Sequence, residues 1–364
     1  MSKRVSVIIP TYNRPKWLLE TIESVLGQTY PDIEIIVVND GSTDNTEQIL
    51  EPYMGRIDYI YKKNGGPGSA VNAGIMAATG DYISRVDDDD LLLPEKIELQ
   101  VEMFEQEPSL GLVSSDHYVM DEEGEIIETR KVPDFSKQGA FLRLLQHCIF
   151  SQPTVMVRRE CHHRVGLYKD TYAQDYDMWI RIAKHYPVNV VHKPLAMYRR
   201  HKLNRSGRSS ADKVTADIQS FICEMMDATS LEELLPNVHS IPHAYDVRGA
   251  VFLAHNLYKR AGREFYKAVK ADSSDMVHRF WSGILLRRMG RYDDANECFS
   301  KVPAGHELYE SSLKAISLVS QIQTIDYENE DEDGDTLRQI RRELSMESIE
   351  LMDMTFDLAT GQIQ

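Results

Sequence analysis

The 364-residue sequence has few cysteines, few basic residues and no long hydrophobic run. Its four cysteines lack CxxC spacing, which favours reduced core thiols in a cytoplasmic protein over disulfides or a zinc site. With 41 basic and 57 acidic side chains the formal charge is −16, which argues against a nucleic-acid-binding protein. No run of about 18 apolar residues occurs, so we expect no transmembrane segment. Peripheral attachment to the inner face of a membrane is the alternative to a free cytoplasmic protein.

Short β-rich runs alternate with helical patterns in the first part of the chain. The predicted strands are Val5–Pro10, Glu34–Asn39, Ile57–Tyr61 and Tyr82–Val86. The predicted helices between them are Pro15–Gln28, Asp44–Tyr53 and Gly68–Ala78. This alternation predicts the α/β class, with a Rossmann-like, mostly parallel mixed sheet. Ligands of such sheets bind beyond the carboxyl ends of the strands, where polar residues occur in this sequence.

The second part of the chain is expected to be all-α. We expect an α/β catalytic domain over 1–210, helices over 211–325, an acidic linker over 326–335 and a last helix over 336–364. Four residues recur 34 positions later: Gly249, Tyr258, Ala261 and Phe265 as Gly283, Tyr292, Ala295 and Phe299. This period predicts tetratricopeptide-like hairpins, with a generic helical bundle as the alternative. Such helices could form a homodimer or bind a protein partner.

Four consecutive aspartates, Asp87–Asp90, directly follow the predicted strand Tyr82–Val86. Their carboxylates repel one another, so a fold would avoid this arrangement unless a cation relieved the repulsion. Mg²⁺ and Mn²⁺ prefer carboxylate oxygens and commonly bridge protein to substrate phosphates. The pattern therefore predicts a divalent-cation site, and a solvated acidic turn is the alternative.

Other polar residues at predicted strand and helix ends have both a structural and a functional interpretation. Asp40 could accept a hydrogen bond from a uracil ring or could simply form a turn. The glycine-rich segment 64–68 precedes a predicted helix and could bind an anion, although glycine-rich turns are common. Asp175 could have a functional role or could only cap a helix. A lone histidine such as His201 is more often structural than a ligand.

Together these segments resemble the family 2 glycosyltransferases, which have the fold called GT-A. The resemblance covers residues 1 to about 207, in order and with similar spacing. The matching stretches are SVIIPTYNRP, IIVVNDGSTDNT, GGPGSAVNAGI, GDYISRVDDDDLLLP, AQDYDMWIRIA and YRRHKLNRSG. The DxD motif of the family corresponds to Asp87-Asp88-Asp89. This sequence departs from the family at one position. The acidic pair of the family begins with Glu, whereas this sequence has Gln174 there, followed by Asp175.

The resemblance implies a role for each matching residue. Asp175 is expected to be the catalytic base, and Asp89 and His201 are expected to bind Mn²⁺ or Mg²⁺ as the cofactor. The expected contacts with the nucleotide sugar are Pro10, Thr11, Tyr12, Asn13, Arg14, Asp40, Gly68, Asn72, Asp87 and Asp88. We expect segment Gln146–Arg158 and the loop before Asp175 to lie on the acceptor side.

The expected function is inverting hexosyl transfer from a nucleotide-diphosphate sugar, UDP-linked, to a hydroxyl acceptor. The acceptor could be a glycan, a lipid-linked oligosaccharide or a protein, in the synthesis of a cell-surface polysaccharide or glycoconjugate. A sugar nucleotidyltransferase would have a glycine-rich loop with Arg and Lys after the first strand, where this chain has Thr11-Tyr12-Asn13-Arg14. An inactive transferase-like scaffold that presents the helical region to a partner is the alternative from another class.

Overall fold

The computed structural model describes residues 3–135, 139–202, 204, 210–234, 240–306 and 308–317. The chain divides into two compact units, Met1–Ile218 and Gln219–Gln364. The predicted boundary after residue 210 lies in front of helix α8 (Ala211–Asp227), whereas the division between the units falls inside this helix. The predicted acidic linker 326–335 and last helix 336–364 lie outside the described residues.

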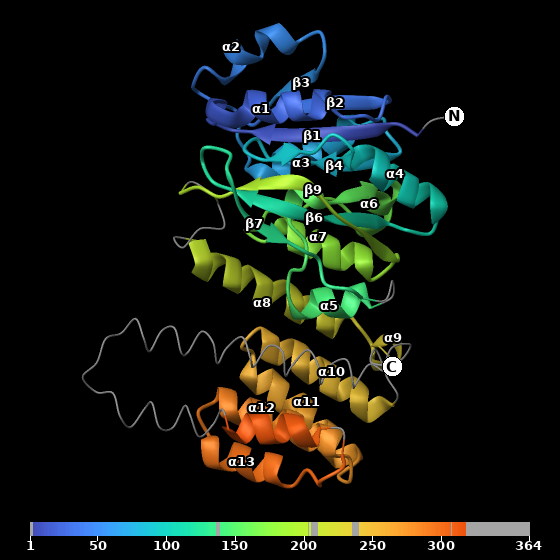
Figure 1. Ribbon diagram of the computed structural model, residues 1–364, viewed down its shortest axis with the longest axis vertical. Coiled ribbons are helices and arrows are strands. Elements are labelled where there is room, and N and C mark those ends of the chain that lie inside the picture. Colours follow the sequence, from blue (N-terminus) through green and yellow to red (C-terminus); the bar gives the residue numbers. More distant parts are fainter. Residues whose placement is uncertain are drawn as a thin grey trace, which may run out of the picture. The chain divides into compact units, whose positions relative to one another are not determined.

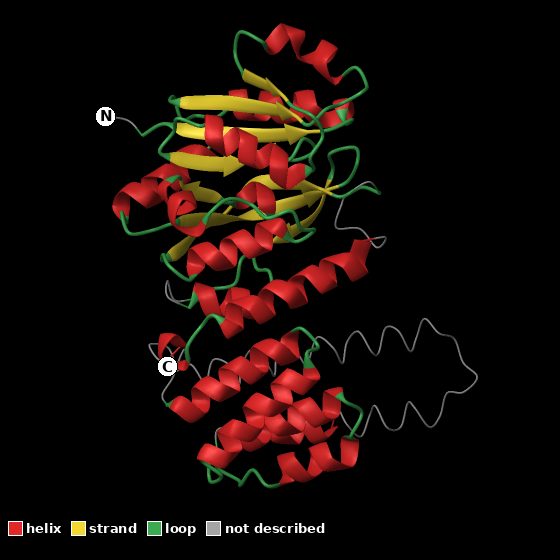
Figure 2. Cartoon of the chain, turned by 180° about the vertical axis from the view of Figure 1, so that it is seen from behind, coloured by secondary structure: helices red, strands yellow, loops and turns green. Residues whose placement is uncertain are grey.

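Four parallel strands form the first half of the sheet in unit 1, in the order β3-β2-β1-β4 (Figures 1 and 2). They are β1 (Val5–Thr11), β2 (Ile33–Asn39), β3 (Asp58–Tyr61) and β4 (Tyr82–Arg85). Every residue of β1 is buried, as expected for an inner strand of a parallel sheet with both faces covered. Thr11 is paired with Asn39, so β1 and β2 end at the same edge.

The second half of the sheet mixes parallel and antiparallel pairs, which confirms the mixed sheet expected from the sequence. Its strands are β5 (Leu91–Leu92), β6 (Leu112–Met120), β7 (Ile126–Arg130), β8 (Met156–Arg158) and β9 (Val188–Arg199). Strand β8 is antiparallel to both β4 and β6, whereas β6 is parallel to β9. The result is a nine-stranded mixed sheet within the described part of the chain.

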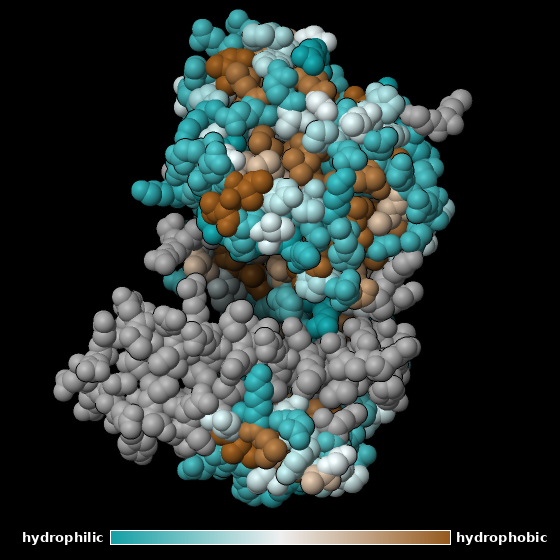
Figure 3. Space-filling model, viewed as in Figure 1, coloured by the Kyte–Doolittle hydropathy of each residue, from teal (hydrophilic) through white to brown (hydrophobic). Residues whose placement is uncertain are grey.

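Helices surround this sheet in unit 1. They are α1 (Pro15–Leu26), α2 (Thr46–Leu50), α3 (Pro67–Ala77), α4 (Lys96–Gln106), α5 (Ala140–Gln146), α6 (Glu160–Val165) and α7 (Gln174–Ala183), with short 3-10 turns at Glu51–Tyr53 (η1) and Gln152–Thr154 (η2). Helix α3 approaches β1 so closely that a Cβ at Gly74 would lie 2.5 Å from Ile8 Cγ2. On the face shown in Figure 3, hydrophilic residues surround separate apolar patches.

Unit 2 is helical in its described residues, as the sequence predicts. Its elements are α9 (Leu231–Leu234), α10 (Ile241–Ala254), α11 (Tyr258–Ala271), α12 (Met276–Arg288), α13 (Tyr292–Ser300) and helical residues 309–317. A Cβ at Gly249 would lie 2.3 Å from Phe265 Cε1, and one at Gly283 would lie 2.6 Å from Phe299 Cε1. The two hairpins therefore share a contact at equivalent positions, while their tetratricopeptide-like nature stays an interpretation. None of the described helices is both long enough and apolar enough to cross a membrane.

Candidate active site

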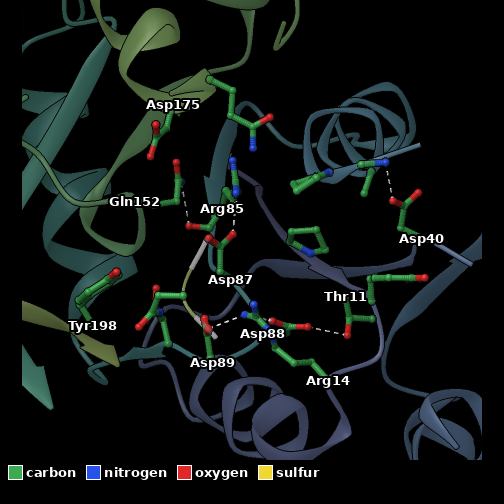
Figure 4. Close-up of a pocket in the computed structure, with 18 of the residues that line it drawn as sticks. Thr11, Arg14, Asp40, Arg85, Asp87, Asp88, Asp89, Gln152, Asp175 and Tyr198 are labelled. Atoms are coloured by element: carbon green, nitrogen blue, oxygen red, sulfur yellow. Dashed lines mark hydrogen bonds and ion pairs between the residues drawn. The ribbon is translucent and has the colours of Figure 1, made fainter. Parts of the chain in front are cut away.

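A cavity of about 620 Å³ lies at the carboxyl ends of β1, β2 and β4 (Figure 4). Thr11 ends β1, Asp40 follows β2, and Asp87–Asp90 follow β4, so three strand ends supply one wall. In Figure 4, Asp40 and Thr11 lie on one side and Asp175 on the other, with Asp87 between them. The parallel register of the strands thus brings together groups that are far apart in the sequence.

The β1 end supplies most of the predicted nucleoside segment. Pro10, Thr11, Tyr12 and Arg14 line the cavity, and Tyr12 is 47% exposed, which leaves its ring open to stacking with a base. Asn13 is not among the described lining residues. Its φ is +50° and its side-chain oxygen accepts a hydrogen bond from the backbone N–H of Thr43 at 2.8 Å. Asn13 therefore joins the loop after β1 to the loop after β2.

Asp40 lines the cavity as predicted, and its carboxylate also organises the glycine-rich segment. Its oxygens accept hydrogen bonds from the backbone N–H groups of Gly65, at 3.0 Å, and Gly66, at 2.8 Å, and from Lys62 Nζ at 2.6 Å. Gly66 has a φ of +85°, in the left-handed region that favours glycine. Asp40 thus fixes the turn before α3, and its contact with uracil stays a prediction.

Gly68 and Asn72 both have structural contacts in this protein, and their expected contacts with the nucleotide sugar stay predictions. Neither is among the described residues that line the cavity. The side-chain amide of Asn72 donates to the carbonyl of Tyr168 and accepts from its N–H, both at 2.9 Å. A Cβ at Gly68 would lie 2.6 Å from Gln174 Oε1 and 3.0 Å from the Lys169 carbonyl. Both residues hold segment 168–174 against α3.

The aspartates Asp88, Asp89 and Asp90 are buried, at most 4% exposed, which contradicts the solvated-turn alternative. Asp88 accepts hydrogen bonds from Thr11 Oγ1, at 2.7 Å, and Arg14 Nη1, at 3.2 Å. Burial raises the pKa of Asp88 to about 7, and Asp89 adds to the rise while Arg14 opposes it. Burial and neighbouring carboxylates also raise the pKa of Asp90. The cluster is short of positive charge, as a cation site would be.

His201 and Asp89, the two residues expected to bind the metal ion, lie side by side. His201 Nε2 is 2.8 Å from Asp89 Oδ2, and the imidazole packs on the Trp17 ring with centroids 4.5 Å apart. Arg14 also binds this carboxylate. No group of three or more His, Cys, Asp or Glu side chains suited to a metal ion occurs among the described residues. Asp89 and His201 are thus two neighbouring donor groups, and metal binding by them stays a prediction.

The donor pair would fit a divalent cation in chemistry. Its 2.8 Å contact is an ordinary hydrogen bond or ion pair between Asp89 Oδ2 and His201 Nε2. Mg²⁺ usually keeps several waters and binds one or two carboxylates together with substrate phosphates. A carboxylate that lines the cavity and an imidazole beside it are donor types that such an ion could use.

Asp175 lines the opposite side of the cavity, in the first turn of α7. One of its oxygens accepts a hydrogen bond from the backbone N–H of Tyr176 at 2.8 Å, which orients the half-buried carboxylate. Burial raises the pKa of Asp175, while the Arg85 guanidinium opposes the rise. A carboxylate with a raised pKa is a stronger general base, provided that it is ionised.

Sequence reasoning did not single out Arg85, Gln152 and Tyr198, which also line the cavity. Arg85 is buried and donates to Asp87 from Nε at 2.9 Å and from Nη2 at 2.8 Å. Its place two residues before Asp87, the start of the aspartate run, was a usable signal. Gln152 comes from the 3-10 turn η2, inside the segment expected on the acceptor side, and no local pattern marks it.

Known structures share this fold. The crystal structure of Staphylococcus aureus TarS residues 1–349 in complex with UDP-GlcNAc matches with a TM-score of 0.54 and 18% identity. The match covers 87% of this chain and 90% of that chain. The mixed sheet with its acid-lined cavity at the strand ends is therefore the GT-A fold of glycosyltransferases, and the fold prediction is confirmed.

Sequence relatives identify the family. A family model described as glycosyl transferase family 2 matches residues 6–166. An uncharacterized glycosyltransferase of Rickettsia prowazekii (strain Madrid E) is 30% identical over 302 residues, which cover 79% of this chain and 93% of the relative. This chain belongs to glycosyltransferase family 2.

Other relatives are longer than the matched region. An uncharacterized glycosyltransferase of Rickettsia conorii is 34% identical over 268 residues, which cover 71% of this chain and 44% of that protein. The chondroitin synthase of Escherichia coli is 32% identical over 194 residues, which cover 52% of this chain and 28% of that enzyme. This chain thus matches less than half the length of these two relatives, and their activities do not transfer to it directly.

Proposed function

We propose that this protein is an inverting, metal-dependent glycosyltransferase that moves a hexosyl group from a UDP-sugar to a hydroxyl acceptor. The observation that carries the proposal is the arrangement of one cavity. Asp175 lies on one side, the nucleoside segment at Thr11 and Asp40 on the other, and Asp87–Asp89 between them (Figure 4). The chondroitin synthase among the relatives supports a role in cell-surface polysaccharide or glycoconjugate synthesis. The UDP-GlcNAc complex of TarS, which shares the fold, agrees with a UDP-sugar donor.

The acceptor side of the mechanism rests on Asp175. Its carboxylate takes the proton from the acceptor hydroxyl as the oxygen attacks the anomeric carbon. Burial raises its pKa, and the hydrogen bond from Tyr176 N–H orients the carboxylate, which lines the cavity. Because the base and the nucleotide segment lie on opposite sides, attack comes from the face opposite the leaving group. A single displacement of this kind inverts the anomeric configuration.

The donor side rests on the strand ends. Tyr12 offers a ring to the base, while Thr11 and Arg14 hold the Asp88 carboxylate in place. Asp89 and His201 would hold a divalent cation, which offsets the charge that develops on the leaving diphosphate. The cavity aligns donor and acceptor before reaction, and this alignment removes much of the entropic barrier.

The structure bears on the two alternatives, an inactive scaffold and a sugar nucleotidyltransferase. An inactive scaffold needs no open cavity, yet here a cavity of about 620 Å³ is lined by the predicted base and by the predicted metal carboxylate. A sugar nucleotidyltransferase would place a basic glycine-rich loop after β1, where this protein has Thr11, Tyr12 and Arg14. Both observations favour transfer. Partner binding or dimer formation by the helical unit stays a prediction.

Nucleotide binding tests the proposal without knowledge of the acceptor. We expect calorimetry to show UDP binding that strengthens at least about 10-fold with Mn²⁺, because substrate phosphates complete the coordination of the ion. Asp89→Asn should abolish that enhancement, while Asp134→Asn, a change at a side chain that is 98% exposed, should keep it. If no nucleotide binds to folded protein with or without Mn²⁺, the transferase proposal is wrong and the scaffold alternative is favoured.

A further inference from the structure

Helix α11 of unit 2 has a positively charged exposed face, although the whole chain has a formal charge of −16. Five of its 14 residues are basic and one is acidic. Four of the basic residues and one tyrosine are exposed and together form what we call the basic stripe: Lys259, Arg263, Tyr266, Lys267 and Lys270. Their spacing places them within an arc of about 100° of the helix and along a length of about 16 Å. The stripe is thus one continuous surface.

Little of the charge of the basic stripe takes part in contacts within the protein. Lys267 Nζ is 2.7 Å from Glu264 Oε1, but no ion pair joins Lys259, Arg263 or Lys270 to another of the described residues. Like charges four residues apart, such as Lys259 and Arg263, destabilise a helix slightly. Tyr266, at the centre of the stripe, is 68% exposed. Cations around an exposed aromatic ring favour a binding surface for a negatively charged partner over a role in packing.

The second hairpin of unit 2 provides an internal comparison for the basic stripe. At their buried positions α11 and α13 are alike, since each has an alanine and, four residues later, a phenylalanine. At their exposed positions they differ, because α13 has three acidic side chains and no basic one. Asp293 is exposed at the position equivalent to Lys259, and Glu297 at that of Arg263. The hairpin therefore folds without a basic face, so packing does not explain the stripe.

The shape and chemistry of the basic stripe determine which partner fits. A lipid bilayer or a nucleic-acid duplex is wider than a helix of about 10 Å diameter. Stacked repeats place equivalent positions side by side, so a partner of that width would also meet the acids of α13, which repel it. A single extended chain can follow α11 alone. Acidic groups on this chain would bind the cations, and an apolar ring face would pack on Tyr266.

We propose that the basic stripe binds an anionic glycan and is a second carbohydrate site of this protein, in unit 2. The lysines and Arg263 bind carboxylate, sulfate or phosphate groups of the glycan, and Tyr266 stacks on a sugar ring. The choice of a glycan over an acidic peptide depends on Tyr266 and rests on the proposed function, to which it adds that the acceptor is a glycan with negative groups. The charge of the surface itself does not depend on that function.

Binding of labelled polymers to the full-length protein tests the proposed partner by fluorescence anisotropy. The probes are fragments of hyaluronan, chondroitin sulfate, phosphomannan and neutral dextran, together with poly-glutamate, single-stranded DNA and phosphatidylglycerol vesicles. We expect at least one anionic glycan to bind at least about 10-fold more tightly than dextran, and added salt to weaken it because exposed charges are screened. Tighter binding of poly-glutamate, DNA or vesicles than of every glycan, or binding of no anionic glycan, would overturn the inference. Titration with UDP tests the proposed function separately.

Matched variants on the two hairpins test the surface itself. We expect Lys259→Ala combined with Arg263→Ala to weaken the best anionic glycan by at least about 5-fold, since each exposed charge contributes a few-fold. Arg291→Ala combined with Lys301→Ala removes two exposed cations that flank α13, and this control should stay within about 2-fold. Tyr266→Ala should weaken the glycan by at least about 3-fold, whereas Tyr266→Phe keeps the ring and should bind as the parent protein does. Equal losses in the two double variants, or an unchanged affinity in Tyr266→Ala, would contradict the proposed site.

Discussion

Unit 1 and unit 2 both bury carboxylates whose pKa is raised by burial, but the surroundings of these groups differ. In unit 1, Asp175 and Asp88 line a cavity with more aspartates than arginines. In unit 2, Asp246 is fully buried between α10 and α12 and is hydrogen-bonded to His278 Nδ1. A buried acid with a raised pKa is therefore no sign of chemistry by itself. An opening to a cavity and an unbalanced charge distinguish the site in unit 1.

The largest difference in rate between the two units should come from replacing one buried aspartate in each unit by asparagine. Asp175→Asn removes the base, and we expect UDP release in the presence of an acceptor to fall by at least about 10³-fold. Asp246→Asn, the matched change in unit 2, should leave the rate within about 2-fold at a temperature where the variant is folded. Steady-state rates with intact UDP binding as a control measure both. Equal rates for Asp175→Asn and the parent protein would remove Asp175 from the mechanism.

The buried Asp246–His278 pair of unit 2 should instead matter for stability. Alanine at His278 leaves the buried Asp246 carboxyl without its partner, and breaking a buried pair by removing one member costs about 3–5 kcal/mol. We expect urea denaturation of His278→Ala to show a loss of this size, in the transition of the helical unit. A loss below about 1 kcal/mol would mean that the pair contributes little to the folded state.

The repeated glycines of unit 2 should give a smaller loss. A Cβ at Gly249 or Gly283 would lie within 2.6 Å of a phenylalanine ring, so alanine at either position should cost about 1–3 kcal/mol by overpacking. Gly262→Ala is the control, because a Cβ there meets its nearest neighbour at 3.4 Å and alanine favours a helix. Thermal unfolding of the three variants measures the difference. A stabilising Gly249→Ala would contradict the close helix contact.

The smallest expected effect is a difference in pH dependence. Burial raises the pKa of Asp175, so kcat/KM should fall on acidification at a higher pH than an ordinary aspartate would produce. In unit 2, burial raises the pKa of Asp246 to about 6. Burial by itself would lower the pKa of His278, but the hydrogen bond to Asp246 and the charges of Asp246, Asp275 and Asp272 together raise it. The folded state therefore binds the protons of Asp246 and His278 more tightly than the unfolded state does. The contribution of this pair to stability is greatest in acid and declines as pH rises through the folded-state pKa values.

Activity and helical stability are therefore expected to change in opposite directions between about pH 4 and pH 7. A pH–rate profile and a series of urea melts measure the two. The dependence of the melts on pH should weaken in His278→Ala. A stability that rises with pH in the parent protein would show that the Asp246–His278 pair does not control this trend.

Much of the strand-end side of the cavity was predictable from sequence, because the patterns that mark it are local. The apolar run Val5–Pro10 marks a buried strand, and Asp87–Asp90 directly after Tyr82–Val86 implies a strand-end cluster. The 34-residue spacing of Gly249 and Gly283 likewise predicted equivalent positions, which both contact a phenylalanine ring of the following helix.

The rest depends on contacts between distant segments, which no local pattern shows. The antiparallel pairs of β8 with β4 and β6 join segments far apart in the chain. Gln152 reaches the cavity because η2, directly before β8, packs against β4, β6 and β9. Asn72 matched a motif of the family, yet its amide is hydrogen-bonded to the backbone of Tyr168. A motif match therefore locates a segment near the site but does not say which side chains face the ligand.

The anomeric configuration of the product tests the central claim most directly. With the best donor among a set of UDP-sugars and a hydroxyl acceptor, the anomeric proton of the product is observed by NMR. An α-linked UDP-hexose should give a β-linked product, because Asp175 activates the acceptor on the face opposite the diphosphate. An α-linked product would contradict single displacement and require a different role for Asp175.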